Sequence, residues 1–381
     1  MQQFTLGARV LFGKNSLQSL ETIPGKKVLL VTDNVMVSMN VPERVNEILC
    51  RQGKECRVFS EVTPDPNLDV ISSGVRSYQK CPPDAVIALG GGSVIDTAKG
   101  IIYSLYQMNK EYGTAFIKPY FVAIPTTSGT GSEVTSFTVV TMDSGKMALV
   151  DEWMVPDVAL LDSSLTMSVP DKVTADTGID VLCHALEAYV STDATDFSDA
   201  MCEKAAELVF DHLIDAYIDG SNQSAREKMH YASCIAGIAF TNASLGIVHS
   251  LAHALGGLFH VPHGKANALL LPEVMRFNAQ NDYAMQRYAT MAKHLELPGT
   301  TSQKRCESLI LAVETLRNML NVPQFIQDVG IERTDWEEAL FEMCNLALND
   351  RCTATNPIQP TINEIRAIYQ QAFSPASTTK G

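Results

Sequence analysis

The sequence predicts an α/β domain built on a doubly wound, mainly parallel sheet, followed by an all-α domain. Up to about residue 165, compact apolar runs alternate with segments of helical periodicity, and after Pro170 most of the chain follows a 3.6-residue period. The chain has 381 residues, 46% of them hydrophobic and 19% charged, which is enough for two cores. We therefore expect an α/β domain over residues 1–168 and a helical domain over residues 169–381.

Four apolar runs in the first part are predicted strands, because continuous runs of Val, Ile, Leu and Phe are typical of strands buried on both faces of a sheet. They are KKVLLVTD (26–33), ECRVFSEV (55–62), DAVIALGGG (84–92) and YFVAIPTTS (120–128). Helical spacing predicts helices between them, over VPERVNEILCRQG (41–53) and SVIDTAKGIIYSLYQ (93–107). This alternation favours parallel pairing of the strands.

The second part contains long segments with helical periodicity and few strand signals. They include DKVTADTGIDVLCHALEAYV (171–190), DFSDAMCEKAAELVFDHLIDAYIDG (196–220) and SAREKMHYASCIAGIAFTNASLG (224–246). A further helix begins near VHSLAHALGG and should end at Gly256 and Gly257, and Pro262 then predicts a turn.

Composition excludes several classes of partner. The net charge of −14 and the pI near 5.0 argue against nucleic acid and against an anionic membrane surface, both of which require a basic face. No apolar run approaches the roughly 20 residues of a membrane-spanning helix, and MQQFTLGARVLFGK lacks a signal pattern. Nine scattered cysteines without a CxxC motif indicate reduced thiols, so we expect a soluble protein of the cytoplasm.

Two polar loops indicate a site for a phosphorylated ligand. Gly90, Gly91, Gly92 and Ser93 stand between a predicted strand and helix, where glycines let a phosphate approach unpaired N–H groups. The spacing is not G-x-G-x-x-G, and a tight turn with a serine cap remains an alternative. IPTTSGTGSEVTS (124–136) follows the next strand, and loops after adjacent parallel strands converge at one edge of the sheet.

Asp33 ends the first predicted strand, where a carboxylate can accept hydrogen bonds from a ribose diol and would repel a 2′-phosphate, which favours NAD over NADP. The order is unusual, because the acid precedes the glycine turn instead of following it by about 20 residues. An aspartate that caps a turn is the alternative interpretation.

Four of the eight histidines lie within VHSLAHALGGLFHVPHGKAN (248–267). His249 and His253 are one helical turn apart on one face, and the turn at Pro262 could return His263 to that face. Asp180 and His184 have the same spacing on another, otherwise apolar helix, where neither belongs unpaired. These five residues are candidates for a divalent metal site of about four ligands, and spacing alone does not choose among them. His260 is the weakest candidate, and His212, His230 and His294 have no supporting context.

The motifs together resemble the iron-containing (group III) alcohol dehydrogenases along essentially the whole chain. The matching stretches are GGGSVIDTAK (90–99), IPTTSGTGSEVT (124–135), DKVTADTGIDVLCHALEAY (171–189) and GIVHSLAHALGGLFHVPHGKANALLLP (246–272). Within the family the chain is most similar to 1-propanol or ethanol dehydrogenases of bacterial microcompartments, with lactaldehyde reductase and 1,3-propanediol dehydrogenase as relatives.

The resemblance implies a Rossmann-like first domain and an all-α second domain, as in dehydroquinate synthase. It also implies reversible hydride transfer between NAD(H) and a small primary alcohol or aldehyde, such as 1-propanol, ethanol or their aldehydes. The implied metal is one divalent ion, Fe²⁺ or alternatively Zn²⁺. The protein would be a homo-oligomer, at least a dimer, in the cytoplasm or inside a bacterial microcompartment.

The family's functional residues carry over position by position. Its metal ligands fall on Asp180, His184, His249 and His263, and a further active-site histidine near the nicotinamide falls on His253. Its cofactor-binding residues fall on Asp33, on Gly92, Ser93, Val94, Ile95 and Asp96, on Thr126, Thr127 and Thr130, and on Lys146. An acid that precedes the glycine turn, as Asp33 does here, is therefore what this family shows.

Two positions depart from the pattern of lactaldehyde reductase: Asp65 replaces an Asn, and Ile358 replaces a common Arg.

Two other functions fit part of the sequence. A lyase or synthase like dehydroquinate synthase would need more Lys and Arg near the apolar SLAHALGGLF segment. A nucleotide-binding scaffold that forms filaments would leave Asp180 and the clustered histidines without a purpose.

Overall fold

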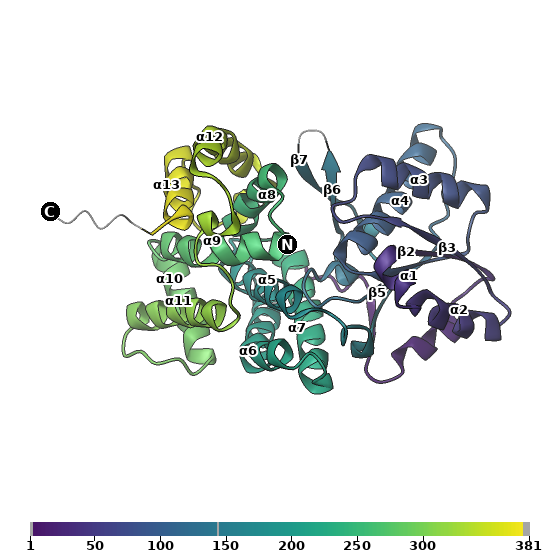
Figure 1. Cartoon of the computed structure of the whole chain (residues 1–381), viewed down its shortest axis with the longest axis horizontal. Helices are drawn as coiled ribbons and strands as arrows, with labels where there is room; N and C mark the ends of the chain where they lie inside the picture. The colour runs from purple at the N-terminus through teal and green to yellow at the C-terminus, as the bar shows by residue number, and fades with distance from the viewer. Residues whose placement is uncertain (1–2, 143–144, 376–381) are drawn as a thin grey trace. The chain divides into compact units, whose positions relative to one another are not determined.

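The computed structural model describes residues 3–142 and 145–375, and the side chains of residues 3–141 and 147–375. The chain divides into two compact units (Figure 1). One, the α/β unit, is Thr5–Val169; the other, the helical unit, contains the described residues from Pro170 onward together with Gln3 and Phe4. Among the described residues, strands occur only in the α/β unit.

The α/β unit is built on a six-stranded sheet in which every pair of neighbours is parallel. In spatial order the strands are β1 (Arg9–Phe12), β8 (Val158–Leu161), β5 (Tyr120–Pro125), β4 (Ala85–Gly90), β2 (Lys27–Asp33) and β3 (Glu55–Val62). The predicted parallel sheet is thus confirmed, and the four predicted strands form its centre and one edge. The short edge strand β1 and the strand β8 were not predicted.

Helices cover both faces of this sheet. Successive side chains of a strand point to opposite faces, and β2 shows both sets buried: Leu30 packs with α2, whereas Leu29 packs with α3 and α4. The helices of the unit are α1 (Asn34–Ser38), α2 (Val41–Arg51), α3 (Leu68–Lys80) and α4 (Gly92–Glu111). Burial on both faces explains why β2, β4 and β5 are continuous apolar runs in the sequence.

The strand order places a topological switch point between β2 and β4. From β2 the chain crosses to β3 at the edge and then returns to β4 on the other side of β2. In open parallel sheets, ligands bind beyond the carboxyl ends of the strands at such a point. Asp33 is the last residue of β2 and Gly90 the last residue of β4, so the predicted acid and glycine turn flank it.

An antiparallel hairpin, β6 (Phe137–Met142) and β7 (Gly145–Val150), follows the second polar loop. The register pairs Phe137 with Val150 and Thr141 with Lys146. This hairpin was not predicted.

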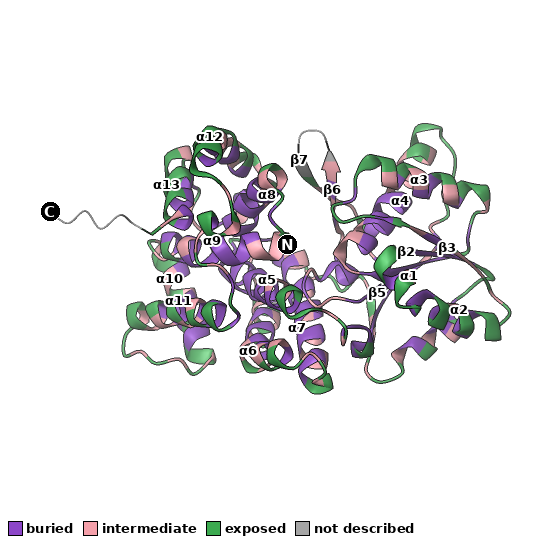
Figure 2. Ribbon diagram, in the orientation of Figure 1, coloured by how far each residue is buried: buried purple, intermediate pink, exposed green. Residues whose placement is uncertain are grey.

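The helical unit contains nine described α-helices. They are α5 (Asp171–Val190), α6 (Asp196–Ile218), α7 (Gln223–Ala243), α8 (Ile247–Phe259), α9 (His263–Asn278), α10 (Asp282–His294), α11 (Ser302–Met319), α12 (Arg333–Asn349) and α13 (Ile362–Phe373). Helix α5 packs against α6, α7 and α9 and is buried from Gly178 to Val190, as its purple colour in Figure 2 shows. A helix surrounded in this way places polar side chains in the interior only where they have partners.

The predicted end of helix α8 is wrong. We expected α8 to end at Gly256 and Gly257, but it continues to Phe259 and ends where His260 adopts a left-handed conformation, with φ of 56°. Helix α8 packs against α9 and α12, and Gly256 is buried. These tertiary contacts outweigh the low intrinsic helix propensity of glycine.

No single described helix is long and apolar enough to cross a membrane. By length and composition alone, one bent pair of helices, α7 with α8, could do so.

Candidate active site

Three helices of the helical unit bring together four of the predicted residues. Helix α5 contributes Asp180 and His184 from successive turns, α8 contributes His249, and α9 begins at His263. One oxygen or nitrogen atom of each of these residues lies within 4.8 Å of the others. We call these four residues the Asp–His cluster. The turn at Pro262 does return His263 toward the other candidates, as predicted.

Asp180 is the centre of the Asp–His cluster. Its Oδ1 atom lies 3.9 Å from His184 Nε2 and 3.8 Å from the Nε2 atoms of both His249 and His263. Asp180 and His249 are each 2% exposed, and His184 is 4% exposed, whereas the side chain of His263 is 31% exposed. Three of the four side chains are thus held in the interior, and the fourth borders the surface.

Asn267 shows that this arrangement suits a cation. Its Nδ2 group donates a 2.6 Å hydrogen bond to Asp180 Oδ1 and lies 3.2 Å from the Nε2 atoms of both His249 and His263. The carboxylate and imidazole lone pairs therefore converge on a partial positive charge, while the buried Oδ1 of Asn267 has no partner among the described residues. One carboxylate oxygen and three imidazole nitrogens, without a thiolate, form a donor set for Fe(II) or Zn(II).

Glu187, which sequence reasoning missed, fixes the orientation of His249. It lies on α5 one turn beyond His184, its Oε2 is hydrogen-bonded to His249 Nδ1, and its Oε1 accepts a 2.6 Å bond from the Val248 N–H. Burial raises the pKa of the Glu187 carboxyl and lowers the pKa of His249 well below its ordinary value. A proton on Nδ1 leaves the Nε2 lone pair facing the Asp–His cluster, as in carboxylate–histidine–metal arrangements.

Helices α5 and α9 approach each other closely at Gly264, next to His263. A Cβ atom at this position would lie 2.3 Å from the backbone oxygen of Asp176 and 3.4 Å from the Cβ of Asp180. Only glycine fits this contact, which sets the distance between Asp180 and His263.

His253 lies beside the Asp–His cluster and has a different partner. Its ring stacks on the His263 ring, with centroids 5.4 Å apart and an interplanar angle of 16°. Its Nδ1 atom is 2.9 Å from Oδ2 of Asp350, which sequence reasoning also missed. Of the remaining histidines, His260 is exposed, as predicted for the weakest candidate.

In the α/β unit, the two predicted cofactor loops are in contact. Thr126 N–H donates a 3.0 Å bond to the carbonyl of Gly90. A Cβ at Gly92 would lie 2.7 Å from Thr130, and one at Gly91 would lie 3.3 Å from Thr127. The glycines therefore let the threonine loop close over the N-terminus of α4, a 20-residue helix whose first turn can bind an anion. The side chains of Val94 and Ile95 are buried in the core, and Val94 packs against Gly90.

The two acids of this region have structural partners. One oxygen of Asp33 caps α1 by accepting a 2.9 Å bond from Met36 N–H, which matches the alternative interpretation. Asp96 accepts bonds from Ser132 Oγ at 2.7 Å and from Val139 N–H at 3.2 Å, and thus holds the second loop. Asp65 adopts a φ of 54°, a conformation that suits Asp and Asn alike. The side chain of Lys146 lies outside the described residues.

Lys99, one turn after Asp96, is a further residue that sequence reasoning missed. Its ammonium group is fully buried and donates to Ser132 Oγ, to the Thr135 carbonyl and hydroxyl, and to the Phe137 carbonyl, over 2.7 to 3.1 Å. Burial lowers its pKa to about 8. A lysine within the apolar helical stretch IDTAKGII was the available signal.

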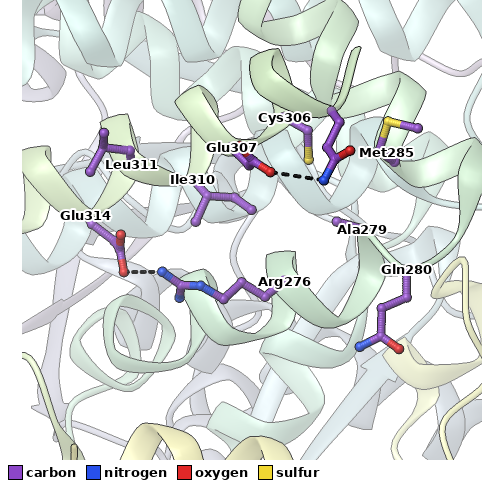
Figure 3. Close-up of a pocket in the computed structure, with 10 residues that line it drawn as sticks. Arg276, Ala279, Gln280, Met285, Cys306, Glu307, Ile310, Leu311 and Glu314 are labelled. Carbon is purple, nitrogen blue, oxygen red and sulfur yellow. Dashed lines mark hydrogen bonds and ion pairs between the residues drawn. The ribbon is translucent and has the colours of Figure 1, made fainter. Parts of the chain in front are cut away.

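A cavity of about 400 Å³ between α9, α10 and α11 contains none of the predicted site residues (Figure 3). Arg276 and Glu314 form an ion pair at its edge, with 2.6 Å between Nη2 and Oε1.

Comparison with known proteins identifies the family. Residues 7–163 match the family described as "Iron-containing alcohol dehydrogenase", and residues 174–373 match "Fe-containing alcohol dehydrogenase family, C-terminal". The chain belongs to the iron-containing alcohol dehydrogenase family. This alcohol dehydrogenase is 42% identical to a 1-propanol dehydrogenase of Citrobacter freundii, over 94% of this chain and 96% of that protein. It is 38% identical to an NADPH-dependent butanol dehydrogenase of Clostridium saccharobutylicum, over 98% of each chain.

A solved structure of 1,3-propanediol oxidoreductase has the same fold as this alcohol dehydrogenase. The TM-score is 0.90 at 34% identity, and the match covers 98% of this chain and 100% of that one. The predicted fold, family and enzymatic activity are confirmed, in preference to a lyase or a scaffold. The alcohol dehydrogenase is an oxidoreductase of small alcohols and aldehydes, and its cofactors are NAD(H) and a divalent metal, iron.

Proposed function

We propose that this enzyme interconverts 1-propanol and propionaldehyde, with ethanol and acetaldehyde as secondary substrates, and that the Asp–His cluster holds its metal. The observation that carries the proposal is the convergence of Asp180 Oδ1 and two imidazole Nε2 atoms on the amide nitrogen of Asn267. The similarity to a 1-propanol dehydrogenase supports the choice of substrate. A divalent metal at this position supplies Lewis-acid polarisation of a hydroxyl or carbonyl oxygen.

The residues around the Asp–His cluster have separate roles in this proposal. Glu187 keeps the His249 lone pair directed at the metal. His253, beside His263, exchanges a proton with the substrate oxygen, which loses a proton when the alcohol is oxidised and gains one when the aldehyde is reduced.

The cofactor is held by the α/β unit in this proposal. Gly92, Ser93 and the backbone of Val94, Ile95 and Asp96 would hold the pyrophosphate, together with Thr126, Thr127 and Thr130. Lys146 would also bind the cofactor. Asp33 stands at the switch point, where the carboxylate oxygen that does not cap α1 accepts from the ribose hydroxyls. A negative charge there disfavours a 2′-phosphate, so we expect NADH to be used in preference to NADPH.

The test is NADH oxidation with acetaldehyde, propionaldehyde and lactaldehyde by protein stripped with a chelator and reloaded anaerobically with Fe(II) or Zn(II). We expect activity to return with metal and propionaldehyde to give the highest kcat/KM. His263→Ala should stay inactive, whereas His260→Ala, a matched change of an exposed histidine in the same segment, should behave as the wild type. Inactivity with all three aldehydes while metal is bound would overturn the substrate proposal.

We also propose that the enzyme works as a homo-oligomer, at least a dimer, in the cytoplasm or within a bacterial microcompartment. The family resemblance supports this assignment. Light scattering on the purified protein tests the first part, because a mass near the 41.5 kDa of one chain would contradict it. Fractionation of cells that make the natural protein tests the second part.

A further inference from the structure

Asp350 reaches His253 from a distant part of the chain. It follows α12 and precedes the short 3-10 helix Arg351–Thr355, and its Oδ2 lies 2.9 Å from His253 Nδ1 across 97 residues of sequence. The side chains are only 16% and 11% exposed. Water therefore competes weakly for this bond.

The carboxylate of Asp350 is held in place from its other oxygen. Oδ1 accepts a 2.8 Å bond from Cys352 N–H and a 3.3 Å bond from Ser250 Oγ. Thr353 donates in turn to Ser250 Oγ at 2.8 Å. Burial alone would raise the pKa of Asp350, but the bond and charge of His253 and the Cys352 amide lower it to about 2. The Cys352 N–H and Ser250 Oγ donors both reach Oδ1, which leaves Oδ2 to accept a hydrogen bond from Nδ1–H of His253.

We propose that Asp350 is a positioning residue that fixes the tautomer and ring orientation of His253, so that Nε2 is free to exchange a proton with the substrate. This inference rests on the proposed role of His253. During alcohol oxidation the O–H bond breaks and its proton moves to Nε2, while the C–H bond gives its electron pair as hydride to NAD⁺. The imidazolium that forms is stabilised by Asp350 and returns its proton to solvent. Aldehyde reduction follows the same steps in reverse.

Asp350→Asn separates this role from helix capping. The asparagine can still accept from Cys352 N–H, but it presents an NH₂ group to His253 Nδ1 and thereby favours the tautomer with hydrogen on Nε2. The matched control is Asp151→Asn. Asp151 caps another 3-10 helix by accepting a 2.9 Å bond from Trp153 N–H, and no histidine among the described residues is bonded to it. If Asp350→Asn does not fold, Asp350→Ser keeps a capping oxygen and removes the carboxylate.

Two measurements test the proposal. We expect kcat for propionaldehyde to fall about 100-fold or more in Asp350→Asn, with KM for NADH and bound metal unchanged, and no such loss in Asp151→Asn. Long-range ¹H–¹⁵N NMR of the Zn(II)-loaded, ¹⁵N-histidine-labelled protein should show hydrogen on Nδ1 of His253 in the wild type and on Nε2 in Asp350→Asn. The imidazole signals that disappear in the spectrum of His253→Gln identify those of His253.

A wild-type tautomer with hydrogen on Nε2, or a variant with unchanged kcat, would overturn the role of Asp350. Failure of the proposed function would look different: the wild type itself would be inactive with all aldehydes, and the NMR spectra would still decide whether Asp350 sets the tautomer.

Discussion

Gly264→Ala should break the metal site without touching any ligand. A Cβ at this position would stand 2.3 Å from the backbone oxygen of Asp176, against 3.4 Å for an ordinary contact. The obstacle is backbone of the buried helix α5, which cannot rotate aside, so the N-terminus of α9 must move by about 1 Å. His263 precedes Gly264 directly and moves with it.

The magnitude follows from the tolerance of metal sites. Ligand distances are held within about 0.2 Å, and a displacement of about 1 Å in an active site can cost about 100-fold in rate. The distance between Asp180 Oδ1 and His263 Nε2 is 3.8 Å, and the displacement would lengthen it by a large fraction of a ligand bond. We expect affinity for Zn(II) to fall about 10- to 100-fold and aldehyde reduction to fall with it.

The assay is a competition titration of metal-free protein with Zn(II) and a chromophoric chelator, followed by NADH oxidation at the metal occupancy reached. Gly330→Ala is the matched control: it adds the same methyl group at a φ of 88° with no heavy atom within 4 Å, so it strains the backbone but leaves the Asp–His cluster intact. Zn(II) affinity of Gly264→Ala within twofold of the wild type would refute the reasoning.

Three further predictions concern stability. Lys99→Met removes the donor of three hydrogen bonds to the second predicted cofactor loop and of one to the Phe137 carbonyl in β6. It should lower the free energy of unfolding in urea by about 3 kcal/mol, whereas the exposed Lys80→Met should lower it by less than about 0.5 kcal/mol. Hydrogen bonds from the backbone N–H groups of Lys27 and Lys26 lower the pKa of the Asp84 carboxyl. The contribution of Asp84 to the free energy of unfolding is therefore complete above pH 3.8 and is lost as the pH falls through the lowered pKa. In Asp84→Asn, the midpoint of urea unfolding should depend less on pH than in the wild type between about pH 5 and about pH 2. Removal of the metal by a chelator should lower the Tm in scanning fluorimetry, and metal at about 1,000 times its Kd should restore about 4 kcal/mol of the free energy of unfolding. His263→Ala should not show this recovery, and a full recovery in that variant would contradict the ligand assignment.

Much of the fold could be predicted because the decisive signals are local. Strands β2, β4 and β5 are apolar and buried on both faces, and helix α5 matches its predicted range of 171–190. Strands β1 and β8 have only four residues each, too few for a periodic signal, and they pair with each other across about 150 residues of sequence. The end of α8 was misplaced because packing decides whether Gly256 stays helical.

Candidate residues of the site could be named from sequence because their chemistry is unusual for their setting. A carboxylate or an imidazole buried in an apolar helix is unfavourable unless it has a hydrogen-bond or metal partner. The spacing of four residues places Asp180 and His184 on one face of their helix, and His249 and His253 on one face of theirs. The residues that were missed act over longer distances or look ordinary locally. Asp350 is 97 residues from His253, Glu187 resembles any helical glutamate, and Asn267 follows His263 by one turn without a motif of its own.

The sequence by itself determined the class of fold, the residue types of the metal and cofactor sites and the family, because periodicity, glycine turns and motif spacing are properties of adjacent residues. The tertiary structure supplied the distances that spacing left open, with His249 and His263 beside Asp180 and His184, and it alone revealed that Asp350 contacts His253. The physical reason is that helix packing, set by contacts such as Gly264 against Asp176, fixes distances between residues that the chain keeps far apart.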